Sequence, residues 1–441
     1  MRFFKDISLA VVSGFLVICL FEIGLRVTGT KYESSLYESD PVLYMTFRPH
    51  ARGWEAKEGE NFIRINSHGM RDRERSLQPA PGTIRVALLG DSMMVGSEVP
   101  LDKTVGQVLE RQLDAALAPS GHSIEVLNFA VGGYTLSQEY LALRKRVWAF
   151  RPNIVLLVLS PTSVPSCNRR LFPADIPYFL VREGKLVPDP HNHPPAGSDP
   201  GARRRHAVLG DLMNEFRLLQ MIRKATQDGI PHEIAKLEGT KHAHNDNIVD
   251  MWFRPPDTYD KRAAWDVAEG LLDQMAKDSR VHGAEFWISI VGHEIEETRD
   301  PQKRLEFLTA NHLSDFHYSE SRLQLFATTH RIGFIPLENE LLEYSQQHEI
   351  STRGFFNTAP DRGHWNETGH AAAAGVFADA LLRNSTQLGH RPAVPNSTAI
   401  TAERSTTSQL TQGTTKNHQV EANGDLHTHL AEPKKIPAQL Q

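Results

Sequence analysis

The residues best suited to chemistry are a serine early in the chain and an aspartate–histidine pair near its end. Ser92 follows Gly90 and Asp91, while Asp361 and His364 stand three residues apart. A serine hydroxyl becomes a strong nucleophile when a histidine takes its proton and a carboxylate orients that histidine. These residue types predict a serine hydrolase in which Ser92 attacks, His364 is the general base and Asp361 orients it.

The chain before Ser92 has the pattern of a buried strand. Residues 84–89 form a partly β-branched run that is apolar except for Arg85, which is typical of a strand inside a parallel sheet. Open α/β sheets place their chemistry at the carboxyl ends of such strands, so Ser92 is expected there, with Asp91 bracing the turn. The alternatives are that Ser92 only caps a helix and that the Asp361–His364 pair is only a loop hydrogen bond.

Three motifs together resemble the SGNH (GDSL-like) hydrolase superfamily. They are Gly90-Asp91-Ser92, the run Asn128-Phe-Ala-Val-Gly-Gly133-Tyr134, and Asp361-x-x-His364-Trp365-Asn366. The run from Asn66 to Arg71 also looks like the lead-in of membrane-anchored bacterial members. The resemblance covers roughly residues 60–385 and is weakest in the middle third, yet three motifs in the right order are far more specific than one. It implies a three-layer α/β/α, flavodoxin-like parallel sheet with a Ser-His-Asp triad.

An acyl-transfer site also needs donors for the charge that develops on the substrate oxygen. The backbone N–H of Ser92 is one candidate, and the resemblance implies that of Gly133 as the second; the alternative is that Gly133 only shapes a turn. The family's third donor is usually an asparagine after the next strand, but residues 160–163 are Ser-Pro-Thr-Ser. Thr162 aligns best with the missing asparagine, and Asn168 is the alternative. Losing one such donor typically costs on the order of 3 kcal/mol.

Helix and strand patterns alternate along much of the chain. Strands are predicted at 84–89, 124–128, 154–159, 284–291 and 332–337, and helices at 105–116, 261–279 and 366–382, the last capped by Asn366. This alternation predicts a parallel sheet covered by helices. Residues 165–260 interrupt it and are interpreted as an insertion, in the manner of a lid. The predicted parts are a cytoplasmic start (1–6), a transmembrane signal anchor (7–28), a tether and β-rich lead-in (29–80), an SGNH hydrolase-like domain (81–385) and a disordered tail (386–441).

The N-terminus carries an apolar run that is long enough to span a bilayer. Residues 7–25 are apolar or small except for two serines and Glu22, and Glu22 is expected near the membrane interface. Arg2 and Lys5 favour a cytoplasmic start. No small-x-small cleavage pattern clearly follows the run, so an uncleaved anchor is expected, with a cleaved signal peptide as the alternative. The catalytic domain of this single-pass inner-membrane protein is then predicted to be periplasmic or extracellular.

Composition and motifs also narrow the partners. The formal net charge of −5 gives no electrostatic reason to expect nucleic acid, and no phosphate-binding glycine loop of the GxxxxGK type occurs. His191 with His193 and His242 with His244 lack the company of other ligands at metal-site spacing. We therefore expect no metal and no organic cofactor. Arg203 to Arg205 are interpreted as a solvated face, with an anionic glycan or lipid headgroup as the alternative partner.

The predicted function is hydrolysis of an ester-linked acyl group, acetyl included, on an envelope or exported glycan or on a lipid. The substrate class follows from the inferred location and the resemblance rather than from any pocket residue. One alternative is an O-acyltransferase that passes the acyl group to a glycan hydroxyl. Another is a non-catalytic glycan-binding protein with the same fold, which Thr162 at the asparagine position favours and the Ser92, Asp361 and His364 set opposes.

Overall fold

A parallel sheet with the strand order of flavodoxin-like proteins forms the centre of the fold. The computed structural model describes residues 2–226 and 248–389, and within these ranges the sheet has five strands in the order β11-β10-β7-β5-β6. All neighbouring pairs are parallel. The strands are β5 (Thr83–Leu89), β6 (Ser123–Asn128), β7 (Ile154–Leu159), β10 (Glu285–Ile290) and β11 (Gly333–Ile335). Each predicted strand is present, with ends that differ by at most two residues.

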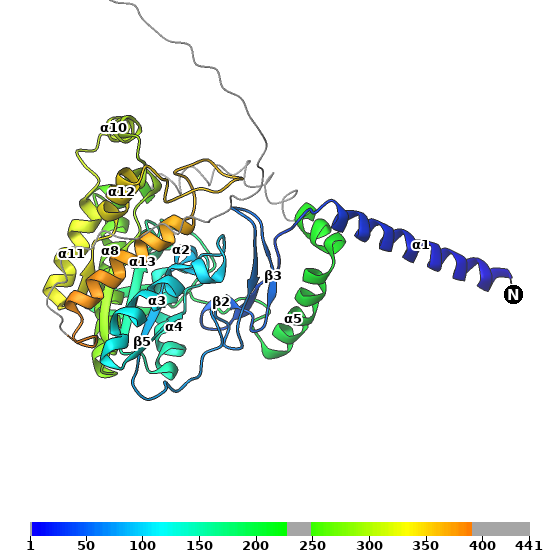
Figure 1. Ribbon diagram of the computed structural model, residues 1–441, viewed down its shortest axis with the longest axis horizontal. Helices are drawn as coiled ribbons and strands as arrows, with labels where there is room; N and C mark the ends of the chain where they lie inside the picture. Colours follow the sequence, from blue (N-terminus) through cyan, green and yellow to red (C-terminus); the bar gives the residue numbers. More distant parts are fainter. Residues whose placement is uncertain (1, 227–247, 390–441) are drawn as a thin grey trace, which may run out of the picture. The chain divides into compact units, whose positions relative to one another are not determined.

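Helices cover both faces of the sheet and complete the three layers that the sequence predicts (Figure 1). One face packs on α3 (Val105–Leu117) and α13 (Glu367–Asn384), and the other on α4 (Leu136–Lys145), α8 (Tyr259–Val281) and α11 (Tyr318–His330). In β5, Val86 and Leu88 join the first core while Ala87 and Leu89 join the second. Successive strand residues point to opposite faces, so a strand covered on both sides reads as a continuous apolar run.

The strand order places a switch point beside Ser92. The chain passes from β5 to β6 on one side of β5, and later strands are added on the other side, beginning with β7. Open α/β sheets bind their ligands outside the carboxyl ends of the strands at such a reversal. The loop after β5, which carries Ser92, lies at this position.

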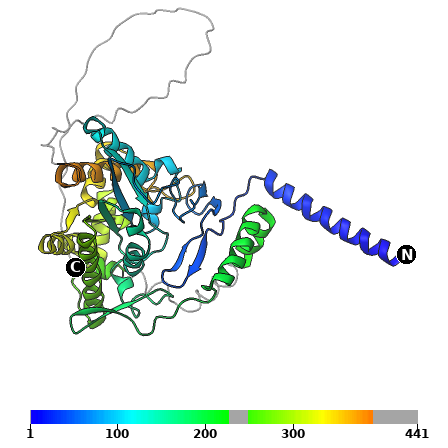
Figure 2. The same ribbon diagram turned by 90° about the horizontal axis from the view of Figure 1, so that it is seen from below.

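The lead-in and the insertion add smaller elements around the sheet. The lead-in forms two antiparallel pairs, β1 (Tyr37–Asp40) with β2 (Tyr44–Phe47) and β3 (Arg52–Glu55) with β4 (Asn61–Arg64). The insertion contributes the hairpin of β8 (Phe179–Arg182) and β9 (Lys185–Pro188) and the helix α5 (Pro200–Glu215), which lies beside β3 (Figures 1 and 2). Further helices are α9 (Glu294–Glu297), α10 (Pro301–Ala310) and α12 (Glu338–Gln347). Part of the insertion and nearly all of the predicted disordered tail lie outside the described residues.

The N-terminal helix α1 (Arg2–Val27) has the properties of a membrane span. Its 26 residues give a length of about 39 Å at 1.5 Å per residue, against a hydrocarbon core of about 30 Å. The stretch Phe3–Val27 is long and apolar enough to cross a membrane, and its large apolar side chains are exposed. Length and composition fit an anchor or a signal sequence equally.

Candidate active site

Ser92 lies at a tight turn between β5 and the one-turn helix α2 (Ser92–Val95). Gly90 has a φ of +155°, and a Cβ at this position would lie 2.5 Å from Cγ of Met94. Only glycine fits such a turn without displacing its neighbours. Asp91 caps α2, because its Oδ1 accepts the backbone N–H of Met93 at 3.0 Å. The expected bracing role of Asp91 is thus confirmed.

The structure brings Ser92 and His364 into direct contact across 272 positions of sequence. The hydroxyl Oγ of Ser92 lies 2.8 Å from Nε2 of His364, the distance expected between a nucleophile and its general base. The His364 side chain is 26% exposed, so it is largely enclosed but reachable from solvent. A serine that only capped a helix would not need this partner.

The carboxylate at the other ring nitrogen of His364 belongs to Glu58. Oε2 of Glu58 lies 3.1 Å from Nδ1 and also accepts the backbone N–H of His364 at 2.8 Å. The ring contact is an ion-pair contact rather than an aligned hydrogen bond, since Nδ1 has no partner of hydrogen-bond geometry among the described residues. Glu98, in the loop after α2, approaches the same nitrogen with Oε1 at 3.6 Å. Sequence reasoning missed both glutamates, because neither belongs to a motif.

The predicted pairing of Asp361 with His364 is therefore corrected. Oδ1 of Asp361 accepts the hydroxyl of Ser351 at 2.6 Å and lies 4.0 Å from Nε of Arg299. Asp361 has a left-handed φ of +62°, and in this conformation its carboxylate meets Ser351 rather than the imidazole. Gly363 completes the turn, and a side chain there would collide with the carboxylate of Glu58.

A buried ion pair holds the loop that carries His364. Arg353 donates from Nε and Nη2 to the two carboxylate oxygens of Glu297, at 2.9 and 2.6 Å. Its Nη1 donates to the carbonyl of Gly363, the residue before His364, at 2.8 Å. The indole of Trp365 donates to Glu297 from the other side at 3.2 Å. A bidentate pair holds the guanidinium in one orientation. Its contacts with Gly363 and Trp365 therefore position the backbone before and after His364.

The charges around His364 favour its protonated form. Burial lowers the pKa of His364, but the carboxylates of Glu58, Glu98 and Asp91 outweigh burial and raise it above the ordinary value. Burial raises the pKa of Glu98 to about 7 despite the attraction of His364. For Glu58 burial acts in the same direction, yet its contacts with His364 leave the pKa below the ordinary value. At neutral pH Glu58 is thus ionised, whereas Glu98 is about half protonated.

The structure brings only some of the predicted oxyanion donors close to Ser92. A Cβ on Gly132 would lie 3.8 Å from Cβ of Ser92, so the turn that contains Gly133 (φ +78°) lies against Ser92. The hydroxyl of Thr162 lies 3.0 Å from that of Ser160. Asn168 donates to the carbonyl of Asp260 at 3.1 Å, so the structure engages it within the insertion.

Tyr37 of β1 is a further side chain at this site that the sequence did not reveal. Its hydroxyl lies 2.8 Å from the position of a Cβ on Gly132, so the phenol and Ser92 face the same glycine. The ring stacks on Phe47 with centroids 4.8 Å apart. Burial, followed by the charges of Glu55 and Glu98, raises the pKa of Tyr37. The phenol therefore stays protonated and can donate a hydrogen bond.

Two further buried residues, Arg71 and His370, bind backbone groups of the segment that follows Ser92. Arg71 is buried and donates to the carbonyls of Val95 and Val99, at 2.8 and 2.5 Å, which ties down the loop after α2. His370 accepts the backbone N–H of Val105 through Nδ1 at 3.3 Å, and burial lowers its pKa to about 3. His370 is thus a neutral acceptor that caps the start of α3.

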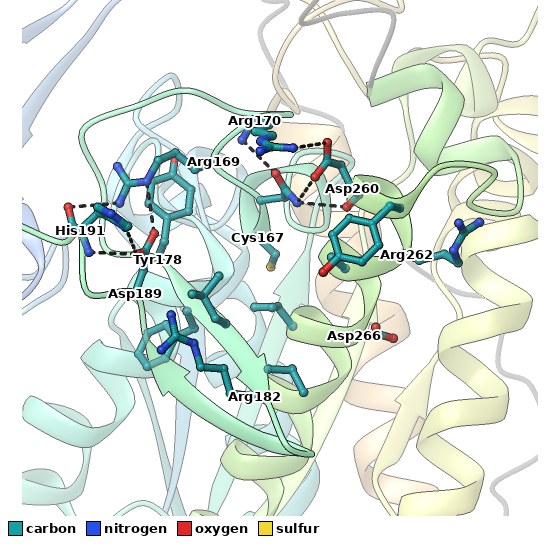
Figure 3. A pocket seen from close by; sticks show the side chains of 17 residues that line it. Cys167, Arg169, Arg170, Tyr178, Arg182, Asp189, His191, Asp260, Arg262 and Asp266 are labelled. Carbon is teal, nitrogen blue, oxygen red and sulfur yellow. Dashed lines mark hydrogen bonds and ion pairs between the residues drawn. The ribbon is translucent and has the colours of Figure 1, made fainter.

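A separate cavity of about 700 Å³ opens between the β8–β9 hairpin and the start of α8 (Figure 3). Neither Ser92 nor His364 lines it. Among the described residues there is no group of three or more His, Cys, Asp or Glu side chains that could hold a metal ion. His191 instead contacts Asp189 at 2.9 Å, while His242 and His244 lie outside the described residues.

Comparison with known proteins gives similar folds but no similar sequence. No protein-family model matches the chain, and no curated protein matches it. Similar solved structures include TesA, at 10% identity and a TM-score of 0.33, covering 67% of this chain and 97% of TesA. LAE5, an α/β hydrolase enzyme from the metagenome of Lake Arreo, Spain, has 12% identity and a TM-score of 0.35, covering 67% and 94%. A catalytic mutant of Axe2, an acetylxylan esterase from Geobacillus stearothermophilus, has 12% identity and a TM-score of 0.34, covering 70% and 95%.

The solved structures that this fold resembles thus include a hydrolase and an esterase. With identities of 10–12% and TM-scores of 0.33–0.35, the likeness concerns the fold and carries no argument about the reaction.

Proposed function

We propose that the chain is a serine esterase that hydrolyses ester-linked acyl groups on a glycan or a lipid outside the cytoplasm. The observation that carries this proposal is the 2.8 Å contact between Oγ of Ser92 and Nε2 of His364. The contact lies on a strand–helix turn at the switch point of the sheet, where open α/β folds place their ligands. A carboxylate, that of Glu58, completes the set at Nδ1.

In the proposed reaction His364 takes the Ser92 hydroxyl proton at Nε2 while Oγ forms a bond to the ester carbonyl carbon. The imidazolium that results is stabilised by the carboxylate of Glu58. His364 then gives the proton to the leaving alcohol, and the acyl group remains on Ser92. Water, deprotonated by His364, releases the acid and restores the serine hydroxyl.

The oxyanion is proposed to bind the backbone N–H groups of Ser92 and Gly133. For both groups the described residues include no hydrogen-bond acceptor, which leaves them free for a ligand. Thr162 remains the sequence-based candidate for the third donor, and the phenol of Tyr37, which faces the same glycine turn, is a second candidate. Tyr37→Phe and Thr162→Val distinguish them, because only loss of the true donor lowers kcat by about a hundredfold.

The location is inferred from α1. An apolar helix preceded by basic residues is proposed to anchor the chain in the inner membrane, with the hydrolase domain on the periplasmic or outer side. O-acylated glycans and lipid esters are the acyl esters present there, and they form the proposed substrate class. No cofactor enters the reaction.

The test uses the full-length protein in phospholipid nanodiscs. Hydrolysis of aryl acetate, butyrate and octanoate is measured for the wild type, for Ser92→Ala and for Ser120→Ala, a matched control at an exposed serine. Labelling by a fluorophosphonate and mass spectrometry of the modified residue report the nucleophile independently. Loss of both signals in Ser92→Ala alone is the expected result, and unchanged hydrolysis in Ser92→Ala would overturn it.

Two other results point to the alternative functions. Wild type that is labelled at Ser92 but releases no acid until a glycan acceptor is added would be an O-acyltransferase. Folded wild type that is neither labelled nor active, with or without an acceptor, would be a non-catalytic glycan-binding protein.

A further inference from the structure

Helix α5 turns a polar face to the rest of the protein. Arg48 donates from Nη1 to the carbonyl of Ala207 at 3.1 Å and to the carboxylate of Asp211 at 2.5 Å. Asn214 exchanges two hydrogen bonds with the backbone of Ser35, at 2.7 and 2.9 Å. A surface helix of a soluble protein ordinarily docks through its apolar stripe, so the docking of α5 is reversed.

The opposite face of α5 is apolar and exposed. Its large side chains are Val208, Leu209 and Leu212, exposed by 66, 56 and 50%, and Phe216, exposed by 44%, follows directly after the helix in extended backbone. The spacing of one and three residues puts Val208, Leu209 and Leu212 on one face of the helix, which together with Phe216 is here called the apolar stripe. A contiguous group of exposed apolar side chains marks a surface that has a partner.

The end of this helix is tied to α1. Nη2 of Arg26 donates to the carbonyl of Glu215 at 2.6 Å. The carboxylate of Glu22 accepts the backbone N–H groups of Arg217 and Leu218, at 3.0 and 2.9 Å, and so caps the helical segment 217–226. Glu22 precedes the last residue of α1, Val27, by about 7.5 Å of helix at 1.5 Å per residue. The C-terminal end of the apolar stripe therefore lies at the level where the apolar span of α1 ends.

We propose that α5 is an interfacial helix whose apolar stripe inserts into the bilayer surface beside α1. This inference rests on the proposed anchoring of the chain by α1. Interfacial helices bury their apolar face about 5–10 Å into the headgroup and acyl boundary. Glu22, which binds residues 217 and 218, precedes the end of α1 by about 7.5 Å, which falls within this range. Arg204 and Arg205, exposed near the start of α5, are then available to lipid phosphates.

The contacts with Glu22 and Arg26 favour lipid over a second copy of the chain as the occupant of the stripe. They hold its end against a helix that is itself surrounded by lipid, and lipid is the apolar phase present there whatever the protein concentration. A helix lying on the bilayer gives the protein a second attachment besides α1. Two attachments fix the tilt of the hydrolase domain, whereas a single span leaves it free to rotate.

Site-directed spin labelling of the full chain in phospholipid nanodiscs tests the proposal. In a Cys19→Ser background, in which the buried Cys167 stays unlabelled, nitroxides are placed by Leu209→Cys and Leu212→Cys. Leu325→Cys, on α11 and 69% exposed, is the matched aqueous control, and Val12→Cys reports α1. The readout is the ratio of collision rates with dissolved oxygen and with a water-soluble nickel complex.

The expected result is an oxygen-to-nickel ratio several-fold higher at 209 and 212 than at 325, approaching that at 12. Equal ratios at 209, 212 and 325 with a lipid-like ratio at 12 would refute the interfacial helix and leave the anchor standing. Protection from both reagents at 209 and 212 would refute it as well, because a protein would then cover the stripe. A water-like ratio at 12 would overturn the anchor, and the proposal with it.

Discussion

Replacing Glu58 by glutamine tests which carboxylate serves His364. The change removes the charge 3.1 Å from Nδ1 and keeps the shape of the side chain. Loss of the carboxylate in a serine triad typically lowers kcat about 10⁴-fold. Glu98 remains at 3.6 Å but is about half protonated near neutrality, so it replaces only part of the lost charge. We therefore expect kcat/KM to fall about 10²–10³-fold at pH 7, or about 3–4 kcal/mol of transition-state stabilisation.

The assay is steady-state hydrolysis of an aryl acetate between pH 6 and 9, with circular dichroism to confirm folding. Asp361→Asn is the matched comparison, since an amide oxygen still accepts the hydroxyl of Ser351, and its loss is expected to stay below about tenfold, too small for a triad acid. The deficit of Glu58→Gln should shrink above pH 7, where Glu98 ionises. A fall of more than a hundredfold in Asp361→Asn with little change in Glu58→Gln would refute the assignment of Glu58 and restore Asp361.

Further predictions concern the supports of the site. Arg353→Lys loses the bidentate pair with Glu297, so we expect kcat to fall about tenfold with KM nearly unchanged and stability to drop by about 1–3 kcal/mol, measured by kinetics and urea unfolding. Gly90→Ala should lower the free energy of unfolding by about 2–4 kcal/mol in the same assay. Gly375→Ala is the control and should not destabilise, because a Cβ on this helical glycine would meet no atom within 4 Å. Equal effects would contradict the claim that the turn at residue 90 requires glycine. Because the pKa of His364 is raised and Nε2 must be unprotonated to accept the serine proton, kcat/KM should rise with pH through a midpoint above 6.5; a midpoint below 6 would contradict this. Glu98 has a pKa of about 7, so its burial lowers the free energy of unfolding as pH rises from 4.5 through 7. Relative to the wild type, Glu98→Gln should gain up to about 3 kcal/mol more stability at pH 8 than at pH 4. The measurement is chemical denaturation at both pH values, and the absence of a pH-dependent gain would contradict the prediction.

The sequence was sufficient for the sheet and for two of the site residues. Largely apolar runs predict the strands because both faces of the sheet are covered. The predicted cap Asn366 accepts the N–H of Gly369 at 3.1 Å. Ser92 and His364 belong to motifs whose spacing is local. Their contact across the fold was expected from the residue types, which suit a nucleophile and its general base, and from the resemblance.

The carboxylate beside Nδ1 of His364 could not be predicted in the same way. Asp361 was chosen for its closeness to His364 in sequence, but a left-handed backbone at Asp361 decides where its carboxylate points. Glu58 reaches His364 from 306 residues away, in a segment that composition marks only as a tether. No periodicity or spacing records such a contact, because it depends on how the lead-in hairpins pack.

The lead-in therefore sets where the functional unit begins. A polypeptide cut to start at residue 81, the boundary that composition suggests, would retain Ser92 and His364 but lose Glu58 and Tyr37. Cleavage between α1 and β1, by contrast, would remove only the apolar helix and leave Tyr37, Glu58, Ser92 and His364 in one polypeptide. A protease acting before these hairpins would thus leave the contact between Glu58 and His364 intact, and one acting after them would separate Glu58 from the part of the chain that carries His364.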